Sequence, residues 1–339
     1  MVQKIAIIGA GVVGLSCAVK ISEFFQNENI DVCLISEKFT PNTTGDGSAG
    51  LWGPYLIGDT AADNINKWSK ESHEFFHDLW KNGKAAEVGI SLINETLLTQ
   101  KPEVANPCWS QVVFGFTPLS YKQLDLLSKE HSVRYTAGAN YVTFTCEPTY
   151  LLPYLMRRFK SAGGKVLEKR VNSFDDLLDQ YDIIINCTGL GAKTLVNDPK
   201  LTPIRGQVAR VEASWIFQST QNDNNYIIPN METVILGGTA QVNDYNENIS
   251  DDDSKFIRSG CSDLNPSTVN STLRKEWAGL RPGRDTVRIE AETFHTGNGK
   301  GRTVIHNYGH GGSGVTTAWG CASDVLELVK ESVSLKCKL

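Results

Sequence analysis

Apolar runs separated by glycine-rich turns and amphipathic stretches alternate along the first part of the chain. Residues 5–8 form an apolar run typical of a buried strand, residues 12–24 carry the apolar spacing of a helix, and residues 30–36 predict a second strand. Strands joined by helices predict a parallel, doubly wound sheet, which binds ligands at the carboxyl ends of its strands. The opening segment therefore predicts an α/β domain with a ligand crevice after residue 8.

The pattern of alternating helix and strand returns after residue 150. Residues 151–162 predict a helix, 165–167 a strand, 174–178 a short helix, and 182–187 a core strand that ends in a glycine turn. Farther along, strand-like runs such as 206–211 and 233–238 follow one another without helical crossovers, which indicates an antiparallel sheet. The acidic triplet Asp251–Asp253 is expected to be a short loop.

These elements predict an α/β protein with a discontinuous Rossmann-like domain and a second, α+β domain that has a mostly antiparallel sheet. The predicted nucleotide-binding domain comprises residues 1–55, 145–195 and 281–339, and the predicted substrate-binding domain comprises residues 56–144 and 196–280. A ligand pocket is expected between the two domains.

A dinucleotide fingerprint occupies the first turn. Gly9, Gly11 and Gly14 follow the first strand as G-x-G-x-x-G, and Glu37 ends the second strand about twenty residues later. The glycines permit a tight turn, a close approach of backbone to pyrophosphate and close packing of the helix, and the carboxylate accepts hydrogen bonds from ribose hydroxyls. Glycine-rich turns also occur where backbones merely cross. The strand, turn, helix and acid found together favour a dinucleotide site.

Composition excludes several other classes of function. The 339-residue chain carries 33 basic and 38 acidic residues, a net charge of −5, and has no basic block suited to nucleic acid. No apolar run reaches the length of about 18 residues expected of a membrane-spanning helix. Eight cysteines without C-x-x-C spacing indicate reduced core residues, and the six histidines show no metal-ligand pattern, so no metal site is expected.

The segment from Val304 to Ala322, VIHNYGHGGSGVTTAWGCA, carries the most specific motif of the chain. It resembles the signature of the D-amino-acid oxidase and D-aspartate oxidase family of flavoproteins. The resemblance extends over most of the chain and includes the N-terminal glycines, the Thr43–Thr44 loop, Arg205-Gly-Gln207, Tyr226-Ile-Ile-Pro229 and Gly279-Leu-Arg281-Pro282.

The resemblance implies FAD as cofactor and oxidative deamination as the reaction. A D-amino acid, O₂ and water would give a 2-oxo acid, ammonia and hydrogen peroxide. The residues expected to bind FAD are Gly9, Gly11, Val12, Val13, Gly14, Glu37, Lys38, Thr43, Thr44, Gly50, Leu51, Val171, Thr188, Gly189, Gly311, Gly314, Val315 and Thr316. An NAD(P)-dependent dehydrogenase would share the opening motif, and a flavin-binding protein without turnover is the non-enzyme alternative.

The resemblance also assigns the residues around the substrate. Arg281 would pair with the substrate carboxylate, Tyr226 would donate to it, and the Gly312 carbonyl would accept from the amine. A guanidinium suits a carboxylate because it binds bidentately and stays charged, although a surface ion pair is the alternative for an arginine. Tyr55 and Ser313 are the remaining expected pocket residues. His306 and His310 are expected to be structural.

Two departures concern the substrate side chain. D-Aspartate oxidases place an Arg after Gly-Gly-Thr, where this chain has Ala240, and the lid Tyr of neutral oxidases is Asn222 here. A second buried carboxylate without a cation would be unfavourable. The sequence therefore predicts broad activity on neutral D-amino acids, with D-Asp and D-Glu as the rival class.

The chain ends in Cys337-Lys338-Leu339, which resembles the S-K-L peroxisomal address. We therefore expect a peroxisomal import receptor as a partner and the peroxisomal matrix as the location. The family resemblance also allows a homodimer.

Overall fold

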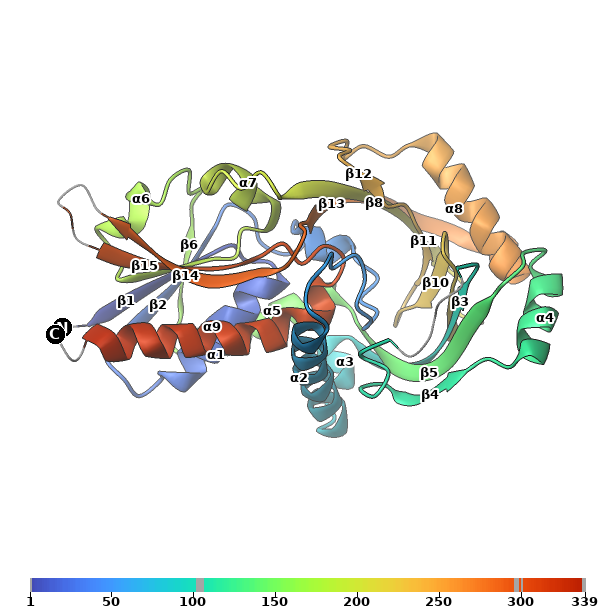
Figure 1. Cartoon of the computed structure of the whole chain (residues 1–339), viewed down its shortest axis with the longest axis horizontal. Coiled ribbons are helices and arrows are strands. Elements are labelled where there is room, and N and C mark those ends of the chain that lie inside the picture. Colours follow the sequence, from blue (N-terminus) through green and yellow to red (C-terminus); the bar gives the residue numbers. More distant parts are fainter. Residues whose placement is uncertain (1, 102–106, 296–298, 300, 337–339) are drawn as a thin grey trace.

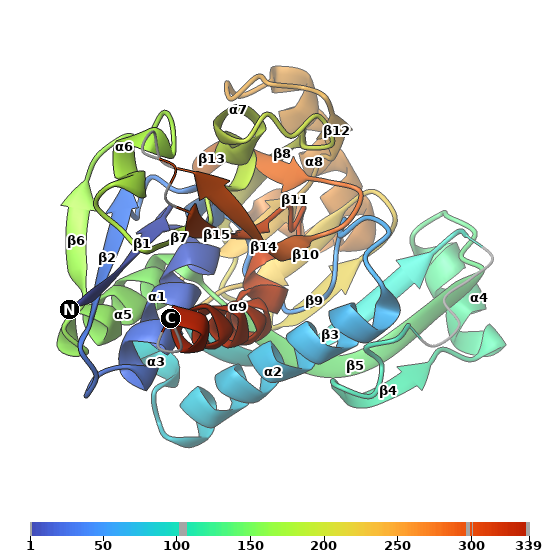
Figure 2. The same ribbon diagram turned by 60° about the vertical axis from the view of Figure 1, so that its left-hand side comes forward.

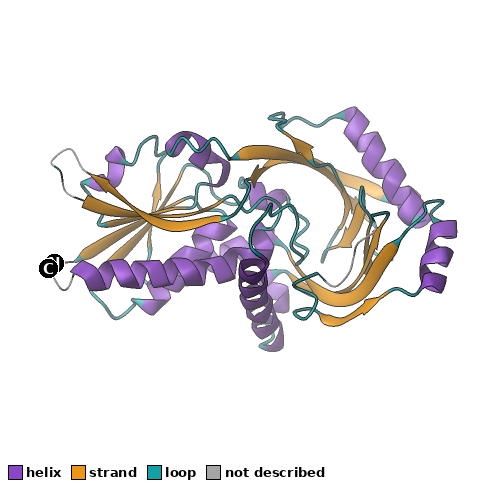
Figure 3. Cartoon of the chain, in the orientation of Figure 1, coloured by secondary structure: helices purple, strands orange, loops and turns teal. Residues whose placement is uncertain are grey.

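The computed structural model describes residues 2–101, 107–295, 299 and 301–336. Within these residues the strands form one six-stranded and one nine-stranded sheet, which lie at opposite ends of the molecule in Figure 1. Helices cover the first sheet on both sides, and the second sheet is strongly curved (Figure 3). The C-terminal tripeptide lies outside the described residues.

The first sheet has the order β14, β15, β7, β1, β2, β6. Neighbours from β15 to β6 are parallel, and β14 pairs antiparallel with β15 as the outer strand. The bounds are β1 Gln3–Ile8, β2 Ile30–Ser36, β6 Lys165–Glu168, β7 Ile183–Asn186, β14 Arg288–His295 and β15 Gly301–Tyr308. The predicted parallel sheet is confirmed, and its central strand β1 leads into the glycine turn.

Helices α1 (Val12–Phe24), α5 (Pro148–Ser161) and α9 (Gly314–Lys336) pack on one face of this sheet, as Figures 1 and 2 show. Their apolar side chains share one core with Ile5 and Ile7 of β1. The opposite face of the sheet buries Ala6 and Ile8 against Phe174 and α6 (Asp175–Leu178). Because successive β1 side chains alternate between the two faces, an apolar run suits a strand covered on both sides.

The second sheet has the order β12, β8, β11, β10, β9, β3, β5, β4, and β13 pairs with the other edge of β8. All of its pairs are antiparallel except β3 with β9. The bounds are β3 Ile90–Thr99, β4 Phe114–Pro118, β5 Ala137–Cys146, β8 Thr202–Glu212, β9 Gln218–Gln221, β10 Tyr226–Pro229, β11 Val234–Gly237, β12 Gln241–Val242 and β13 Thr272–Gly283. The predicted mostly antiparallel sheet is confirmed.

The remaining helices connect or cover these strands. They are α2 Ala62–Lys81, α3 Ala85–Val88, α4 Tyr121–Glu130, α7 Ala192–Leu195, α8 Asp251–Leu264, and the 3₁₀ turns η1 Thr44–Gly47, η2 Gly189–Gly191 and η3 Pro266–Asn270. The chain passes from the second sheet to the first twice, between Cys146 and Lys165 and between Gly283 and Arg288. The predicted domain boundaries stay predictions.

The acidic triplet Asp251–Asp253 is not a loop, so that expectation was wrong. It forms the first turn of α8, and the Ser250 hydroxyl accepts a hydrogen bond from the Asp253 amide as an N-cap. Negative charge at a helix N-terminus is stabilised by the exposed amides and the helix dipole. Helix α8 then buries Ile257 and Cys261 on the outer face of the second sheet, so this region is not free of helices.

Candidate active site

A cavity of about 1760 Å³ lies between the two sheets. Its walls come from the β1–α1 turn, the end of β2, the loop 41–55, the end of β7, strands β10 and β13, and the loop 310–315. Pockets for drug-sized ligands are typically about 300–1,000 Å³, so this cavity has room for a dinucleotide and a small substrate together.

The glycines of the first turn have three different surroundings. Gly9 has φ +103°, and a Cβ there would overlap the Cys187 carbonyl of the neighbouring strand end. A Cβ on Gly14 would overlap the Gly9 carbonyl, whereas a Cβ on Gly11 would meet no atom within 4 Å. Gly9 and Gly14 therefore allow close packing, and Gly11 opens onto the cavity.

Gly11 is also the N-cap residue of α1, and no side chain caps that helix end. Gly11, Val12 and Val13 line the cavity. Uncapped amides at a helix N-terminus attract phosphate groups. The open side of Gly11 thus forms a cradle that fits the pyrophosphate of FAD.

Glu37 and Lys38 line the cavity at the end of β2. The Glu37 carboxylate lies 3.5 Å from the Arg170 guanidinium, and its side chain is 49% exposed. A half-exposed carboxylate retains lone pairs for ribose hydroxyls. Val171 lines the same end of the cavity.

Asp46, which is buried, organises the loop between β2 and the second sheet. Its carboxylate accepts hydrogen bonds from the Thr43 amide at 2.9 Å, the Thr43 hydroxyl at 2.6 Å and the Thr40 hydroxyl at 2.6 Å. The hydroxyl of Thr43 is thus engaged within the loop itself. Farther along, Gly47 packs directly on the ring of Trp277 from β13.

Arg281 reaches the cavity from β13. Its Nη1 donates to the Thr239 carbonyl at 2.9 Å. Its guanidinium lies directly over Gly206, where any Cβ would overlap it, and its Cζ lies 5.8 Å from the centre of the Tyr55 ring. A guanidinium has five N–H donors, so donors remain for a carboxylate. Arg281 is therefore a cavity residue and not part of a surface ion pair.

Tyr226 lies beside Arg281 at the start of β10. Gly237 and Gly238 make room for its ring, because a Cβ on either residue would overlap it. Burial raises the pKa of the Tyr226 phenol, and the positive charge of Arg281 acts more weakly in the opposite direction. The hydroxyl therefore stays protonated at neutral pH and is able to donate a hydrogen bond.

Ser313 and Thr316 are buried, with 0% and 1% of their surface exposed, and neither lines the cavity. The Ser313 hydroxyl donates to the Tyr55 carbonyl at 2.9 Å and accepts from the Tyr55 amide at 2.7 Å. Thr316 makes the same pair of bonds to Gly53. Both hydroxyls hold the 53–55 segment against the start of α9, so Ser313 supports Tyr55 from behind and does not line the pocket as expected.

The structure brings most of the predicted site residues to this one cavity. Those lining it are Gly9, Gly11, Val12, Val13, Glu37, Lys38, Thr43, Thr44, Gly50, Leu51, Tyr55, Val171, Thr188, Gly189, Tyr226, Arg281, Gly311, Gly312, Gly314 and Val315. Gly14, Ser313 and Thr316 support it from behind. The individual binding roles stay predictions.

The two histidines of the glycine-rich segment differ. His306 is buried, with Nδ1 3.3 Å from the Asn186 amide nitrogen and Nε2 3.1 Å from the Glu292 carboxylate. His310 is 2% exposed and lines the cavity, and burial lowers its pKa to about 4. An imidazole with such a pKa is neutral at physiological pH.

Sequence reasoning missed other residues of the wall, including Trp109, Tyr141, Arg210 and Trp277. One signal was present for Trp277, because side chains two residues apart on a strand share a face and Arg281 lies four residues farther along β13. Arg210 donates to the Ser48 carbonyl at 3.1 Å across 162 residues of sequence, a contact that no local pattern indicates.

Across residues 2–101, 107–295, 299 and 301–336, no group of three or more His, Cys, Asp or Glu side chains is arranged to hold a metal ion. In that part of the chain no helix is both long and apolar enough to cross a bilayer. Its seven cysteines are all free, and five of them are buried.

Comparison with known proteins agrees with this geometry. The DAO family model, described as FAD dependent oxidoreductase, matches residues 4–328. The chain is 36% identical to a D-amino acid oxidase of Dugesia ryukyuensis over 344 residues, covering 99% of this chain and 100% of that protein. It is 35% identical to a human D-aspartate oxidase over 333 residues, covering 97% and 95%.

Solved structures show the same fold at lower identity. Glycine oxidase from Geobacillus kaustophilus superposes with a TM-score of 0.77 at 16% identity, covering 97% of this chain and 95% of that one. L-α-glycerophosphate oxidase from Mycoplasma pneumoniae with FAD bound gives 0.74 at 16% identity, covering 97% and 94%. The match to the family of FAD-dependent oxidoreductases identifies FAD as the cofactor in place of NAD(P), and the cradle at Gly11 fits its pyrophosphate. The chain belongs to the DAO family of FAD-dependent oxidoreductases, together with the D-amino acid and D-aspartate oxidases.

Proposed function

We propose that this protein oxidises D-amino acids with O₂ to 2-oxo acids, ammonia and hydrogen peroxide, and that it acts broadly on neutral D-amino acids. The observation that carries the proposal is Arg281, a guanidinium held inside the dinucleotide-sized cavity on a backbone carbonyl. Such a group suits the carboxylate that every amino acid carries.

The chain's own residues then bind and orient the substrate. Arg281 pairs with the carboxylate, the protonated Tyr226 hydroxyl donates to the same group, and the Gly312 carbonyl is offered to the amine. The residues around Gly11 would hold FAD, which would supply the hydride acceptor for the α-carbon and the route of the electrons to O₂. Holding the α-hydrogen in place lowers the barrier without a general base, which agrees with the weak basicity of buried His310, whose pKa burial lowers to about 4.

The composition of the cavity wall favours substrates with neutral side chains. Leu51, Leu97, Trp109 and Tyr141 contribute apolar and aromatic surface to it. Ala240, at the position of the D-aspartate oxidase arginine, is exposed and outside the lining. A second substrate carboxylate would lack a cation at that position, which is costly in a buried site.

The rival class, D-Asp and D-Glu, has one specific observation in its favour. Lys101 lines the cavity and is exposed. Its ammonium group would be a partner for a side-chain carboxylate. If the enzyme prefers acidic substrates, Lys101→Met should abolish the preference.

The test is the substrate profile with hydrogen peroxide as readout. We expect kcat/KM for D-Ala and D-Met to exceed that for D-Asp and D-Glu, and L-Ala to be inert. Anaerobic D-Ala should bleach the flavin absorbance. A strong D-Asp preference would refute the neutral assignment, and a yellow protein that no D-amino acid bleaches would refute the oxidase itself.

We also propose that Cys337-Lys338-Leu339 directs the protein to the peroxisomal matrix through an import receptor. A fluorescent protein carrying about the last twelve residues should enter peroxisomes, and removal of Leu339 should leave it in the cytosol.

Homodimer formation stays a prediction that light scattering of the FAD-loaded protein would test.

A further inference from the structure

A fully buried arginine, Arg205, lies behind Arg281, on the other side of the same pair of strands. Arg281 of β13 pairs with Ile204 of β8, and Leu280 pairs with Arg205. Successive side chains on a strand point to opposite faces. Arg281 therefore faces the cavity, whereas Arg205 faces outward under the connection that leads to α8, with 1% exposure.

Arg205 makes five hydrogen bonds. Nε donates to the Asn246 carbonyl at 2.6 Å, and Nη2 donates to the Asn248 carbonyl at 2.7 Å. The other acceptors are the Gln241 amide oxygen at 2.7 Å, the Asp253 carboxylate at 2.5 Å and the Gln207 amide oxygen at 2.8 Å. One guanidinium thus ties β12, the loop 243–250 and the first turn of α8 to β8.

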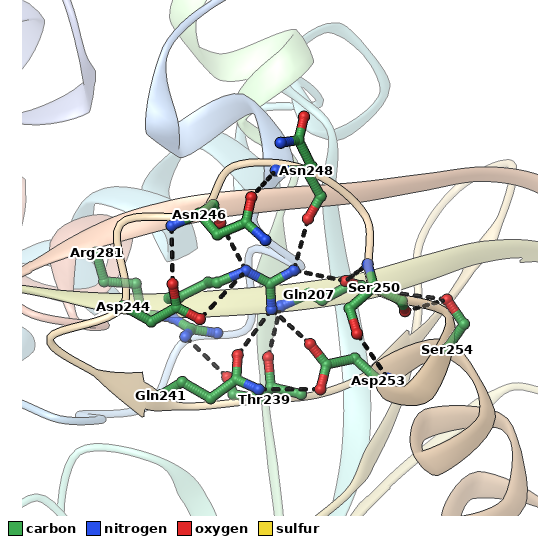
Figure 4. Close-up of polar contacts among 11 residues, drawn as sticks. Gln207, Thr239, Gln241, Asp244, Asn246, Asn248, Ser250, Asp253, Ser254 and Arg281 are labelled. Atoms are coloured by element: carbon green, nitrogen blue, oxygen red, sulfur yellow. Dashed lines mark hydrogen bonds and ion pairs between the residues drawn. The ribbon is translucent and has the colours of Figure 1, made fainter.

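Thr239 connects this cluster to the cavity. Its hydroxyl accepts a hydrogen bond from the backbone amide of Gln207 at 2.9 Å, and its carbonyl accepts one from the Arg281 guanidinium at 2.9 Å. Two residues later, Gln241 lies opposite Arg205 in the pairing of β12 with β8, and its side-chain oxygen accepts a hydrogen bond from the Arg205 guanidinium. Figure 4 shows Arg281, Thr239, Gln241 and Asp253 close together within this group of polar contacts.

Gln207 adds a second link between Arg205 and Thr239. The oxygen of its side-chain amide also accepts a hydrogen bond from the Ser250 backbone amide at 2.9 Å. The nitrogen of the same side chain donates to the Ser250 carbonyl and the Ser254 hydroxyl. The residues that bracket Thr239 in space are therefore both anchored to Arg205. The carbonyl that holds Arg281 thus belongs to a residue that is linked to this cluster through Gln207.

We propose that Arg205 is a positioning residue, which fixes the Thr239 carbonyl and thereby aims the Arg281 guanidinium at the substrate carboxylate. The inference rests on the proposed role of Arg281 as the carboxylate anchor. Bidentate pairing demands fixed geometry, and a misplacement of about 1 Å in a positioning group can cost on the order of a hundredfold in rate.

The experiment uses Arg205→Lys in the FAD-loaded enzyme. Lysine keeps the positive charge beside Asp253 but has three donors in a compact head in place of five in a planar fork. We expect KM for D-Ala to rise about tenfold or more, with a smaller change in kcat. The dissociation constant of benzoate, a carboxylate that is not turned over, should rise by a similar factor in a flavin absorbance titration.

Arg302→Lys is the matched control. Arg302 is 8% exposed and also bridges a backbone carbonyl, that of Leu178, and a carboxylate, that of Asp182, at 2.9 and 2.7 Å. It belongs to the first sheet, so its replacement should lower thermal stability and leave benzoate binding unchanged. If Arg205→Lys likewise lowers stability while benzoate affinity and KM stay at wild-type values, Arg205 is structural and the proposal is overturned.

Two further variants keep the outcomes distinct. Thr239→Val removes the hydroxyl that accepts the hydrogen bond from Gln207 but keeps the carbonyl. It should therefore weaken benzoate binding, and it tests the proposal even if Arg205→Lys fails to fold. Unchanged benzoate binding would overturn the proposal.

Arg281→Ala tests the proposed function itself. In that background Arg205→Lys should cause no further loss of benzoate affinity, and an additive loss would contradict the link.

Discussion

Replacement of Glu95 by Gln should stabilise the protein, and increasingly so as the pH rises. Glu95 lies on β3 between Tyr141 of β5 and Ser219 of β9, with 0% exposure. Ser219 and Gln221 lie beside the carboxyl, but among the described residues neither of its oxygens has a well-aligned hydrogen bond. Burial raises the pKa of Glu95 from 4.5 to about 8, an effect that the two polar neighbours oppose only in part.

The sign follows from proton binding. Between pH 4.5 and about 8 the folded protein holds a proton on Glu95 that the unfolded chain has released. Stability therefore falls as the pH rises through this window and levels off above it. The gap of about 3.5 pH units, at about 1.4 kcal/mol for each, sets an upper limit of about 5 kcal/mol. Gln is neutral at every pH and avoids this loss.

The assay is urea unfolding of the FAD-loaded wild type and Glu95→Gln at pH 5, 6, 7 and 8. We expect a small difference at pH 5 and a gain for the variant of at least about 1 kcal/mol at pH 8. Glu74→Gln is the matched control, because that side chain is 60% exposed on α2, and it should show no such trend. A difference between wild type and Glu95→Gln that is constant with pH would refute the reasoning.

The other predictions concern the cavity. Arg281→Ala should lose more than about 3 kcal/mol of transition-state binding, on the order of a hundredfold in kcat/KM for D-Ala, because the substrate carboxylate is left unpaired; retained turnover would move the anchor elsewhere. Tyr226→Phe should cost about 1.5–3 kcal/mol in the same assay, since it removes one hydrogen bond to a charged group, and an unchanged kcat/KM would exclude that bond. Gly11→Val should raise the FAD dissociation constant with an unchanged circular dichroism spectrum, because its side chain fills the open side of the turn; wild-type FAD affinity would place the pyrophosphate elsewhere.

Local pattern alone predicted four strands of the first sheet, β1, β2, β6 and β7, but not β14 and β15. The expected helix 12–24 and strand 30–36 coincide with α1 and β2, because an apolar run, a glycine turn and a 3.6-residue period leave few alternatives. Motif spacing predicted the dinucleotide site, and the segment 304–322 indicated the family. The local pattern gave a wrong prediction at Asp251–Asp253, because a run of three acidic residues is typical both of a solvated loop and of the first turn of a helix.

Only the tertiary structure decided how the substrate end of the cavity is held. Arg205 and Arg281 carry the same charge and belong to equally distinctive motifs, yet pairing of β8 with β13 sends one side chain into the cavity and the other beneath α8. The burial of Glu95 and the withdrawal of Ser313 behind Tyr55 depend in the same way on partners distant in sequence. Sequence periodicity specifies which face of a strand a residue shares, but the strand register and the helix that covers each face determine what that residue contacts.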